Sequence, residues 1–203
     1  SYSMIAPTIN VDGLIRPAKE ASIPVLDRGF LYGDSVYKVF RTYRGVPLFL
    51  DDHFERLENS ARLIQMQISQ SREELLREIK RTAKIAGVMQ DEDAYVRYQI
   101  TRGDGQVDLY PDPSLKTRYV IIVNTLPSHN AVFYDRGMHM TIPNVRRNPA
   151  NALDPNIKGG NYLNNIMGLT EARQAGADDC VMLSRDGFVT EAANSKVWFV
   201  IRG

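Results

Sequence analysis

One lysine of this chain stands in a context that suits covalent catalysis. Lys158 is followed by Gly159 and Gly160, and Tyr162 stands four residues after the lysine. A lysine that forms a Schiff base needs a site where its amine loses a proton, and neighbouring glycines let a bulky ring approach the backbone. A helix that started early would place Lys158 and Tyr162 on one face. A solvated lysine in a turn fits the same segment equally well.

Four further segments, together with this one, resemble the fold-type IV aminotransferases, the family of the branched-chain and D-amino-acid aminotransferases. In chain order the five are Leu26–Asp34 with Val36–Tyr37, His53–Leu57, Ala94–Arg97 with Thr101–Gly103, Asn156–Asn165, and Thr190–Ser195. Each alone is a weak signal, but five in the family's order are specific. The resemblance covers nearly the whole chain. It implies a pyridoxal-phosphate-dependent aminotransferase with two domains of mixed α/β (α+β) structure.

The resemblance also implies a role for each matched residue. Lys158 would hold the cofactor covalently and move the proton between the substrate α-carbon and C4′ of the cofactor. Glu191 would pair with the pyridine nitrogen and keep it protonated, so that the ring accepts electrons. Arg56 would bind the phosphate, because a guanidinium offers two parallel donors to such an anion. The remaining residues of the expected cofactor site are Tyr162, Asn194 and Ser195.

Several of these residues have plainer interpretations. Glu191 fits a solvated carboxylate at a strand end. Arg56 lies on an expected amphipathic helix, where an arginine is more often a surface charge. Tyr162, expected near the phenolic oxygen of the cofactor, fits a core tyrosine as well.

Strand alternation places the expected substrate residues. Over 94–101 it puts Tyr95 and Arg97 on one face and Tyr98 on the other. In branched-chain enzymes, residues at the positions of Tyr95 and Arg97 help to bind the substrate carboxylate. Tyr32 and Tyr37 would line the pocket with amphipathic rings.

The pocket combines features of two substrate groups. The arginine-x-histidine pair that D-amino-acid enzymes carry after Thr-Arg-Gly is absent at 104–108. Val39, however, stands where branched-chain enzymes tend to have glycine, and it would narrow the space for a side chain. Lys38 and Lys196 stand where the family usually has glutamate and asparagine. Both lysines add positive charge. Lys196 either disturbs the turn or the substrate side of the site, or lies on the surface.

Two kinds of periodicity predict the elements that position these residues. Asp51 and Asp52 suit the start of a helix, and Ser71 with Glu74 forms a capping box for a second helix that ends at Gly87. A third helix is expected over about 160–175. Strands are expected at 36–43, 94–101, 118–124, 138–142, 179–183 and 197–201.

Turn-rich residues divide the chain into two expected domains. We expect an N-terminal α/β domain over 1–124, a linker over 125–137 and a cofactor-binding domain over 138–203. The chain begins with serine and ends on a turn signal after the last expected strand. Family members also bind the phosphate through backbone amides beyond this point. The C-terminal domain is therefore expected to be incomplete.

Charge and cysteine content argue against several other functions. The 203 residues include 25 lysines and arginines against 24 acidic residues, so no overall field favours nucleic acid or an anionic membrane. No apolar run reaches the roughly 18 residues of a membrane span, and the histidines show no metal-ligand spacing. The only cysteine, Cys180, lies in an apolar run that favours a packed strand. A reducing cytoplasm is expected.

The sequence therefore predicts transamination between an amino acid and a 2-oxo acid such as 2-oxoglutarate, with pyridoxal 5′-phosphate as cofactor and a branched-chain-like L-amino acid as the favoured donor. By resemblance, a homodimer or larger homo-oligomer is expected. The alternatives are a D-amino-acid or (R)-amine aminotransferase, an aminodeoxychorismate lyase, and a non-catalytic relative that binds other subunits.

Overall fold

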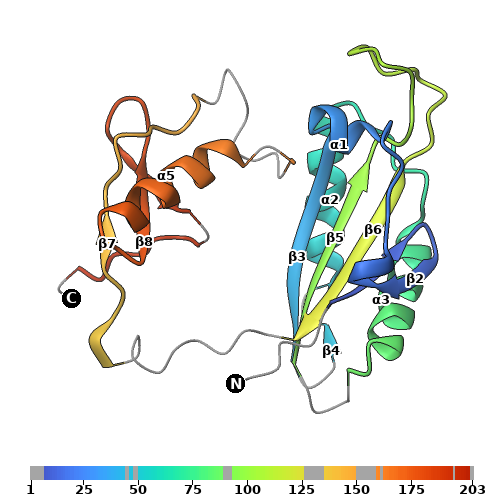
Figure 1. Ribbon diagram of the computed structural model, residues 1–203, viewed down its shortest axis with the longest axis horizontal. Helices are drawn as coiled ribbons and strands as arrows, with labels where there is room; N and C mark the ends of the chain where they lie inside the picture. Colours follow the sequence, from blue (N-terminus) through green and yellow to red (C-terminus); the bar gives the residue numbers. More distant parts are fainter. Residues whose placement is uncertain are drawn as a thin grey trace. The chain divides into compact units, whose positions relative to one another are not determined.

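The chain forms two compact units, which are drawn in Figure 1. The computed structural model describes residues 7–43, 46–47, 50–88, 93–125, 135–149, 159–160, 162–193 and 195–201. Unit 1 comprises Ser1–Pro127 with Asn156–Gly160, and unit 2 comprises Ser128–Pro155 with Asn161–Gly203. The predicted domain boundary and the 125–137 linker stay predictions, since 126–134 lies outside the described residues.

Unit 1 is a six-stranded sheet with helices on one face. The strand order is β2-β1-β6-β5-β3-β4, and every pairing between its described strands is antiparallel. The strands are β1 (Thr8–Val11), β2 (Leu14–Pro17), β3 (Ser35–Tyr43), β4 (Val46–Pro47), β5 (Ala94–Thr101) and β6 (Arg118–Thr125). The helices are the 3-10 turn η1 (Ala18–Glu20), α1 (Arg28–Tyr32), α2 (Leu50–Leu63) and α3 (Arg72–Ile85). The three strands predicted in this unit are confirmed to within one residue at each end.

The core of unit 1 lies between the sheet and the two long helices. Along β5 the side chains of Val96, Tyr98 and Ile100 are completely buried, whereas those of Tyr95 and Arg97 are half-buried on the opposite face. This confirms the predicted alternation. The core face packs against apolar residues that recur at helical spacing, namely Phe54, Leu57 and Ala61 on α2 and Leu75 and Ile79 on α3.

The predicted helix starts are also confirmed. Asp51 and Asp52 lie in the first turn of α2, where carboxylates suit the helix dipole. Ser71 caps α3 by accepting a hydrogen bond from the backbone N–H of Glu74 at 3.1 Å. Gly87 follows α3 with φ +77°, a conformation that favours glycine.

Unit 2 is a three-stranded sheet covered by one helix. The order is β7-β8-β9, with β7 parallel and β9 antiparallel to β8. The elements are β7 (Met140–Thr141), α5 (Leu163–Gln174), β8 (Asp179–Leu183) and β9 (Val189–Ala192). Cys180 is completely buried in β8, as predicted, with its Sγ 3.6 Å from the Sδ of Met182.

Two predictions for unit 2 are wrong, namely the strand at 197–201 and the treatment of 189–192 as a connection only. Residues 197–201 form no strand, and the side chains of 198–201 are exposed. The strand is β9 instead, in a segment expected only to connect strands; it pairs with β8 after the turn at 185–187. An apolar run becomes a strand only where a neighbour accepts its backbone hydrogen bonds, and within the described residues β8 provides that partner to β9. The helix expected from about 160 begins at Leu163.

A buried carboxylate joins the first signature segment to the sheet. Asp27 is completely buried, and its Oδ2 accepts hydrogen bonds from Thr101 Oγ1 at 2.6 Å and Arg118 Nη1 at 2.7 Å. Its Oδ1 caps α1 by accepting from the backbone N–H of Phe30 at 3.2 Å. Gly29 is required here, because a Cβ at this position would fall 2.6 Å from Cγ2 of Thr101. Asp27 thus ties α1 to β5 and β6.

A second ion-pair cluster lies beside it. The buried Arg28 and the partly buried Arg102 both donate to Oδ2 of Asp34, at 2.9 and 2.6 Å. Arg28 also donates to the backbone carbonyls of Asp108 and Leu109, at 2.5 and 2.7 Å. The signature residues therefore fix the loop after β5 as well as α1.

Within the described ranges, none of the helices has the length and the apolar composition that a membrane-spanning segment needs. Among the same residues no cluster of histidine, cysteine and acidic side chains could hold a metal ion.

Replacing Arg118 with methionine should destabilise unit 1 strongly. The substitution leaves the Asp27 carboxylate buried without its cation, which costs about 3–5 kcal/mol. Urea denaturation followed by circular dichroism measures the loss. Arg72→Met is the control, because the Glu58–Arg72 pair is exposed and such pairs contribute little. Equal, small losses for both variants would contradict this account.

The Arg118 variant should also change the acid dependence of stability. Arg118 holds the pKa of Asp104 below its ordinary value of 3.8 through a hydrogen bond. The lowered pKa contributes stability above pH 3.8 that is lost as the pH falls through the folded-state pKa. Without Arg118, the free energy of unfolding should therefore fall less steeply on acidification.

Candidate active site

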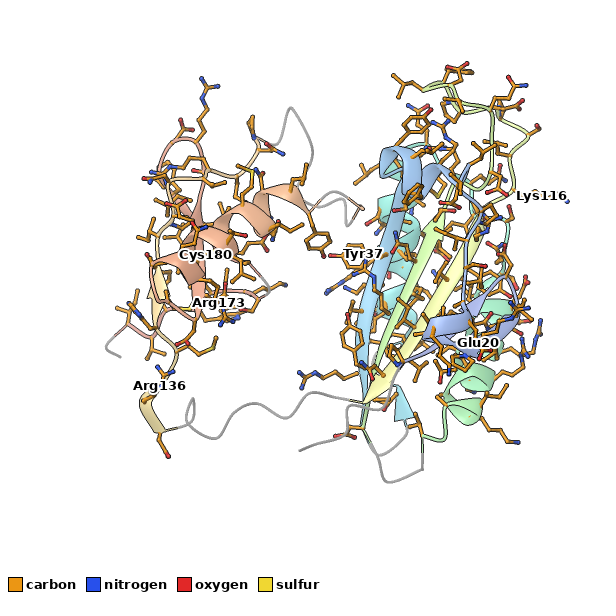
Figure 2. The ribbon with its side chains drawn as sticks, viewed as in Figure 1. Glu20, Tyr37, Lys116, Arg136, Arg173 and Cys180 are labelled. Carbon is orange, nitrogen blue, oxygen red and sulfur yellow. The ribbon has the colours of Figure 1, made fainter. Side chains whose placement is uncertain are left out.

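The sheet face of unit 1 that the helices leave uncovered carries three of the predicted substrate residues. Tyr37 stands on β3, and Tyr95 and Arg97 stand on β5. In the antiparallel register Tyr37 lies opposite Gln99, and Val39 lies opposite Arg97. Figure 2 marks Tyr37 on β3. The structure therefore brings Tyr37, Tyr95 and Arg97 onto one face.

Arg97 is held between two neighbours on that face. Its Cζ lies 4.2 Å from the ring centroid of Tyr37, within the range of a cation–π contact. Its Nη2 donates a hydrogen bond to Oε1 of Gln99 at 3.1 Å. Gln99 in turn donates through Nε2 to Oγ of Ser35 at 2.9 Å. Sequence reasoning gave Gln99 and Ser35 no role, although the alternation placed Gln99 on the face of Arg97.

Tyr32, the fourth predicted substrate residue, lies at the end of α1. Its ring is half-buried, and Cζ of Arg28 lies over it at 4.9 Å from the ring centroid. Gly33 follows with φ +68° and ends the helix in the left-handed conformation. The chain then turns directly into β3, so the structure places Tyr32 beside the start of the strand that carries Tyr37.

The glycines that follow Lys158 lie against the start of β3. Gly159 forms an isolated antiparallel bridge with Val36. A Cβ at Gly160 would fall 2.7 Å from Oγ of Ser35 and 3.3 Å from the carbonyl oxygen of Gly33. Close approach of two backbones therefore explains Gly160. Lys158 itself lies outside the described residues.

Tyr162 lies just before α5 and not within a helix. It is the N-cap of α5, with φ −110° and ψ 11°, and the helix begins only at the next residue. The expectation required a helix that started before both residues. The four-residue spacing therefore does not indicate a helix, because Gly159 and Gly160 lie against β3 and α5 begins only at Leu163.

In unit 2, Glu191 is positioned by an ion pair. It stands on β9, and its carboxylate pairs with the guanidinium of Arg147. Arg147 also donates to Oδ1 of Asn165 at 2.8 Å, and Asn165 donates through Nδ2 to the carbonyl oxygen of Ala193 at 2.8 Å. α5 and the loop after β9 thus hold the arginine in place. Sequence reasoning missed Arg147; its only signal was a basic pair in a loop otherwise rich in proline and asparagine.

The remaining predicted cofactor residues are less constrained. Ser195 is exposed, and its backbone oxygen accepts a hydrogen bond from the N–H of Ala192 at 2.9 Å. Asn194 lies outside the described residues. Arg56 is exposed on α2, and this helix packs against the sheet face opposite to Tyr37 and Arg97. Its assignment to the phosphate stays a prediction.

The two unusual lysines have different environments. Lys196 is exposed. Lys38 is only 5% exposed and lies on the core face of β3, opposite Tyr98. Lys38 therefore lies on the sheet face opposite to Tyr37 and Arg97. Burial raises the pKa of Tyr98 above its ordinary value, so its hydroxyl stays protonated at neutral pH.

Sequence comparison shows the class of protein to which this arrangement belongs. The family model "Amino-transferase class IV" matches residues 35–203, and the chain is a member of that family. Its members comprise pyridoxal-phosphate-dependent aminotransferases and lyases.

The relatives differ from one another in activity. A putative branched-chain-amino-acid aminotransferase of Methanocaldococcus jannaschii is 32% identical over 96% of this chain and 66% of its own length. The aminodeoxychorismate lyase of Bacillus subtilis is 30% identical over 94% of the chain and 64% of its own length. The D-alanine aminotransferase of Bacillus licheniformis is 28% identical over 92% and 63%.

The fold agrees with solved structures of the family. A crystal structure of the Escherichia coli branched-chain amino acid aminotransferase matches with a TM-score of 0.84 at 25% identity, over 93% of this chain and 63% of that one. The enzyme of Thermoproteus uzoniensis with norvaline matches with a TM-score of 0.80 at 28% identity, over 92% and 62%. The predicted mixed α/β fold is confirmed. The chain spans slightly less than two thirds of the length of these relatives.

Gly160→Ala should displace Gly159 and residue 160 from the start of β3. The added Cβ meets Oγ of Ser35 at 2.7 Å, and forced overpacking of this kind costs about 1–3 kcal/mol. Urea denaturation measures the loss, and hydrogen exchange of the segment should quicken. In Gly105→Ala, the control, the new Cβ meets a flexible methyl of Leu115 at 3.3 Å and makes an ordinary van der Waals contact with Cδ of Arg28 at 3.6 Å.

A double variant identifies the clash itself. Ser35→Ala removes the atom that the new Cβ would meet, so adding it to Gly160→Ala should restore part of the lost stability. Strictly additive losses would mean that the hydroxyl of Ser35 does not limit the approach of Gly160.

Proposed function

We propose that this chain is part of a pyridoxal-phosphate-dependent enzyme that exchanges an amino group between an amino acid and a 2-oxo acid such as 2-oxoglutarate. The single observation that carries the proposal is the open face of the unit 1 sheet. There the Arg97 guanidinium is held by Tyr37 and Gln99, and the segment following Lys158 lies on the adjoining strand.

The chain's own residues divide the chemical work. Pyridoxal phosphate, when bound, supplies an electron sink. Lys158 anchors the cofactor and moves the proton at the substrate α-carbon. Arg97, together with Tyr95, orients the substrate carboxylate through charge-assisted hydrogen bonds, and Tyr32 and Tyr37 line the pocket.

The cofactor side of the site uses a carboxylate and its arginine. The ion pair with Arg147 holds the carboxylate of Glu191 in place, and a carboxylate is the group that the pyridine nitrogen requires as its partner. Arg56, with its exposed guanidinium, is proposed to bind the phosphate. Tyr162, Asn194 and Ser195 complete the proposed cofactor set.

A branched-chain-like L-amino acid is the donor that we favour. The sequence identity to a branched-chain relative supports this choice, and so does the lack of an arginine-x-histidine pair after Gly103. Val39 argues for a narrower pocket, since it lies directly opposite Arg97. A D-amino-acid or (R)-amine donor is therefore the second candidate. We further propose a cytoplasmic homodimer or larger homo-oligomer.

Lys158→Ala should abolish turnover together with the covalent link to the cofactor. The wild-type enzyme should show an absorbance band near the visible edge that borohydride abolishes, and the variant should lack it. Lys80→Ala, an exposed lysine on α3, is the control and should behave as wild type. Wild-type activity in Lys158→Ala would contradict the assignment. Pyruvate from aminodeoxychorismate, without glutamate from 2-oxoglutarate, would favour a lyase instead.

Val39→Gly should widen the pocket beside Arg97 and raise activity towards bulky donors. Loss of the β-branched side chain enlarges the pocket, so kcat/KM for leucine should rise relative to alanine by at least roughly 10-fold, the lower end of the effect of one methylene of pocket volume. A scan of L- and D-amino acids and primary amines measures it. Val25→Gly, at an exposed position, is the control. An unchanged leucine-to-alanine ratio would show that Val39 does not limit the donor.

A further inference from the structure

Three polar side chains form a continuous chain across the open face of the unit 1 sheet. Arg97 donates to Gln99 at 3.1 Å, and Gln99 donates to Ser35 at 2.9 Å. Ser35 is only 2% exposed, and Arg97 and Gln99 are half-buried. The chain runs diagonally from β5 to β3 and ends where Gly160 lies against Ser35.

Donor and acceptor chemistry fixes the direction of this chain. A guanidinium has only donors, so the Gln99 amide must present its oxygen to Arg97. Its NH2 group then needs an acceptor, which Oγ of Ser35 provides. If the amide turned over, its NH2 group would face the N–H groups of Arg97. The guanidinium therefore sets the orientation of the Gln99 amide, and Ser35, by accepting from the NH2 group, holds the side chain of Gln99 in place beside Arg97.

The guanidinium is thereby fixed without being neutralised. The Tyr37 ring covers its planar face, and Gln99 occupies one N–H of Nη2. An arginine has five N–H donors, and among the contacts described for this side chain Gln99 takes one of them. The partner is a neutral amide and not a carboxylate, so the full positive charge stays available to an anion.

We propose that Gln99, anchored by Ser35, is a positioning residue that holds Arg97 ready for the carboxylate of the substrate. This inference rests on the proposed function only in taking a carboxylate as the anion that Arg97 binds. Immobilising a long side chain before binding removes an ordering cost that would otherwise weaken affinity by roughly 2- to 10-fold. Gln99 thus favours substrates with a carboxylate over simple amines.

Calorimetric binding of 4-methylpentanoate to the complete cofactor-loaded enzyme tests the proposal without turnover. Gln99→Met keeps the length of the side chain but removes the acceptor, and should weaken binding roughly 2- to 10-fold. Gln99→Glu keeps the acceptor but adds a competing negative charge, and should weaken binding further. Gln67→Met, at an exposed position, should leave the affinity unchanged. The affinity of the uncharged 4-methylpentanamide should stay the same in all variants.

A second variant and a kinetic measurement separate positioning from a general structural effect. Ser35→Ala leaves Gln99 intact but removes its acceptor, so it should weaken carboxylate binding as well. Adding Gln99→Met to it should bring little further loss, because the two residues act in one chain. In steady-state kinetics the variants should raise KM for the carboxylate substrate more than they lower kcat.

The outcomes separate this inference from the proposed function. If Arg97→Met abolishes carboxylate binding while Gln99→Met has wild-type affinity, the positioning role is wrong and the proposed function stands. If Arg97→Met also binds normally, then both the carboxylate role of Arg97 and the positioning role are wrong. If binding of the uncharged amide weakens as much as that of the acid, Gln99 supports the fold and does not position Arg97.

Discussion

The buried carboxylate of Asp27 is the interaction on which unit 1 depends. A completely buried carboxylate is tolerated only where hydrogen bonds and a cation compensate for its lost hydration. Thr101, Arg118 and the backbone of Phe30 supply these on three sides. Because they come from β5, β6 and α1, satisfying one charge fixes three elements at once. The start of β3 follows from this junction, since α1 leads into it through Gly33.

The antiparallel register of β3 and β5 converts that junction into a site. Once α1 and the end of β5 are fixed, each residue of β3 has a set partner on β5, and a shift by one residue would turn every side chain to the other face. Tyr37, Arg97 and Gln99 therefore share a face because Val36, Tyr98 and Ile100 share the other. Core packing and site geometry are two results of one alignment.

How well the sequence predicted each part depends on the physics that each part expresses. Alternation in 94–101 and the Ser71 cap are local signals, and both are confirmed. The strand expected at 197–201 is wrong because an apolar run does not reveal whether a pairing partner exists. Lys38 is buried, although lysines usually keep their charged amine in contact with water. The role of Arg147 was not predicted because it depends on the ion pair with Glu191, and only the folded chain brings these two residues together.

The exposed segment at the end of unit 2 bears on how the chain behaves in solution. Trp198, Phe199, Val200 and Ile201 are 69–101% exposed in succession. Adjacent apolar residues with high β-propensity and free backbone groups readily add to other strand edges. These four side chains therefore form an apolar segment through which two copies of the chain can associate. Concentration, and not temperature alone, would limit how long it stays dispersed.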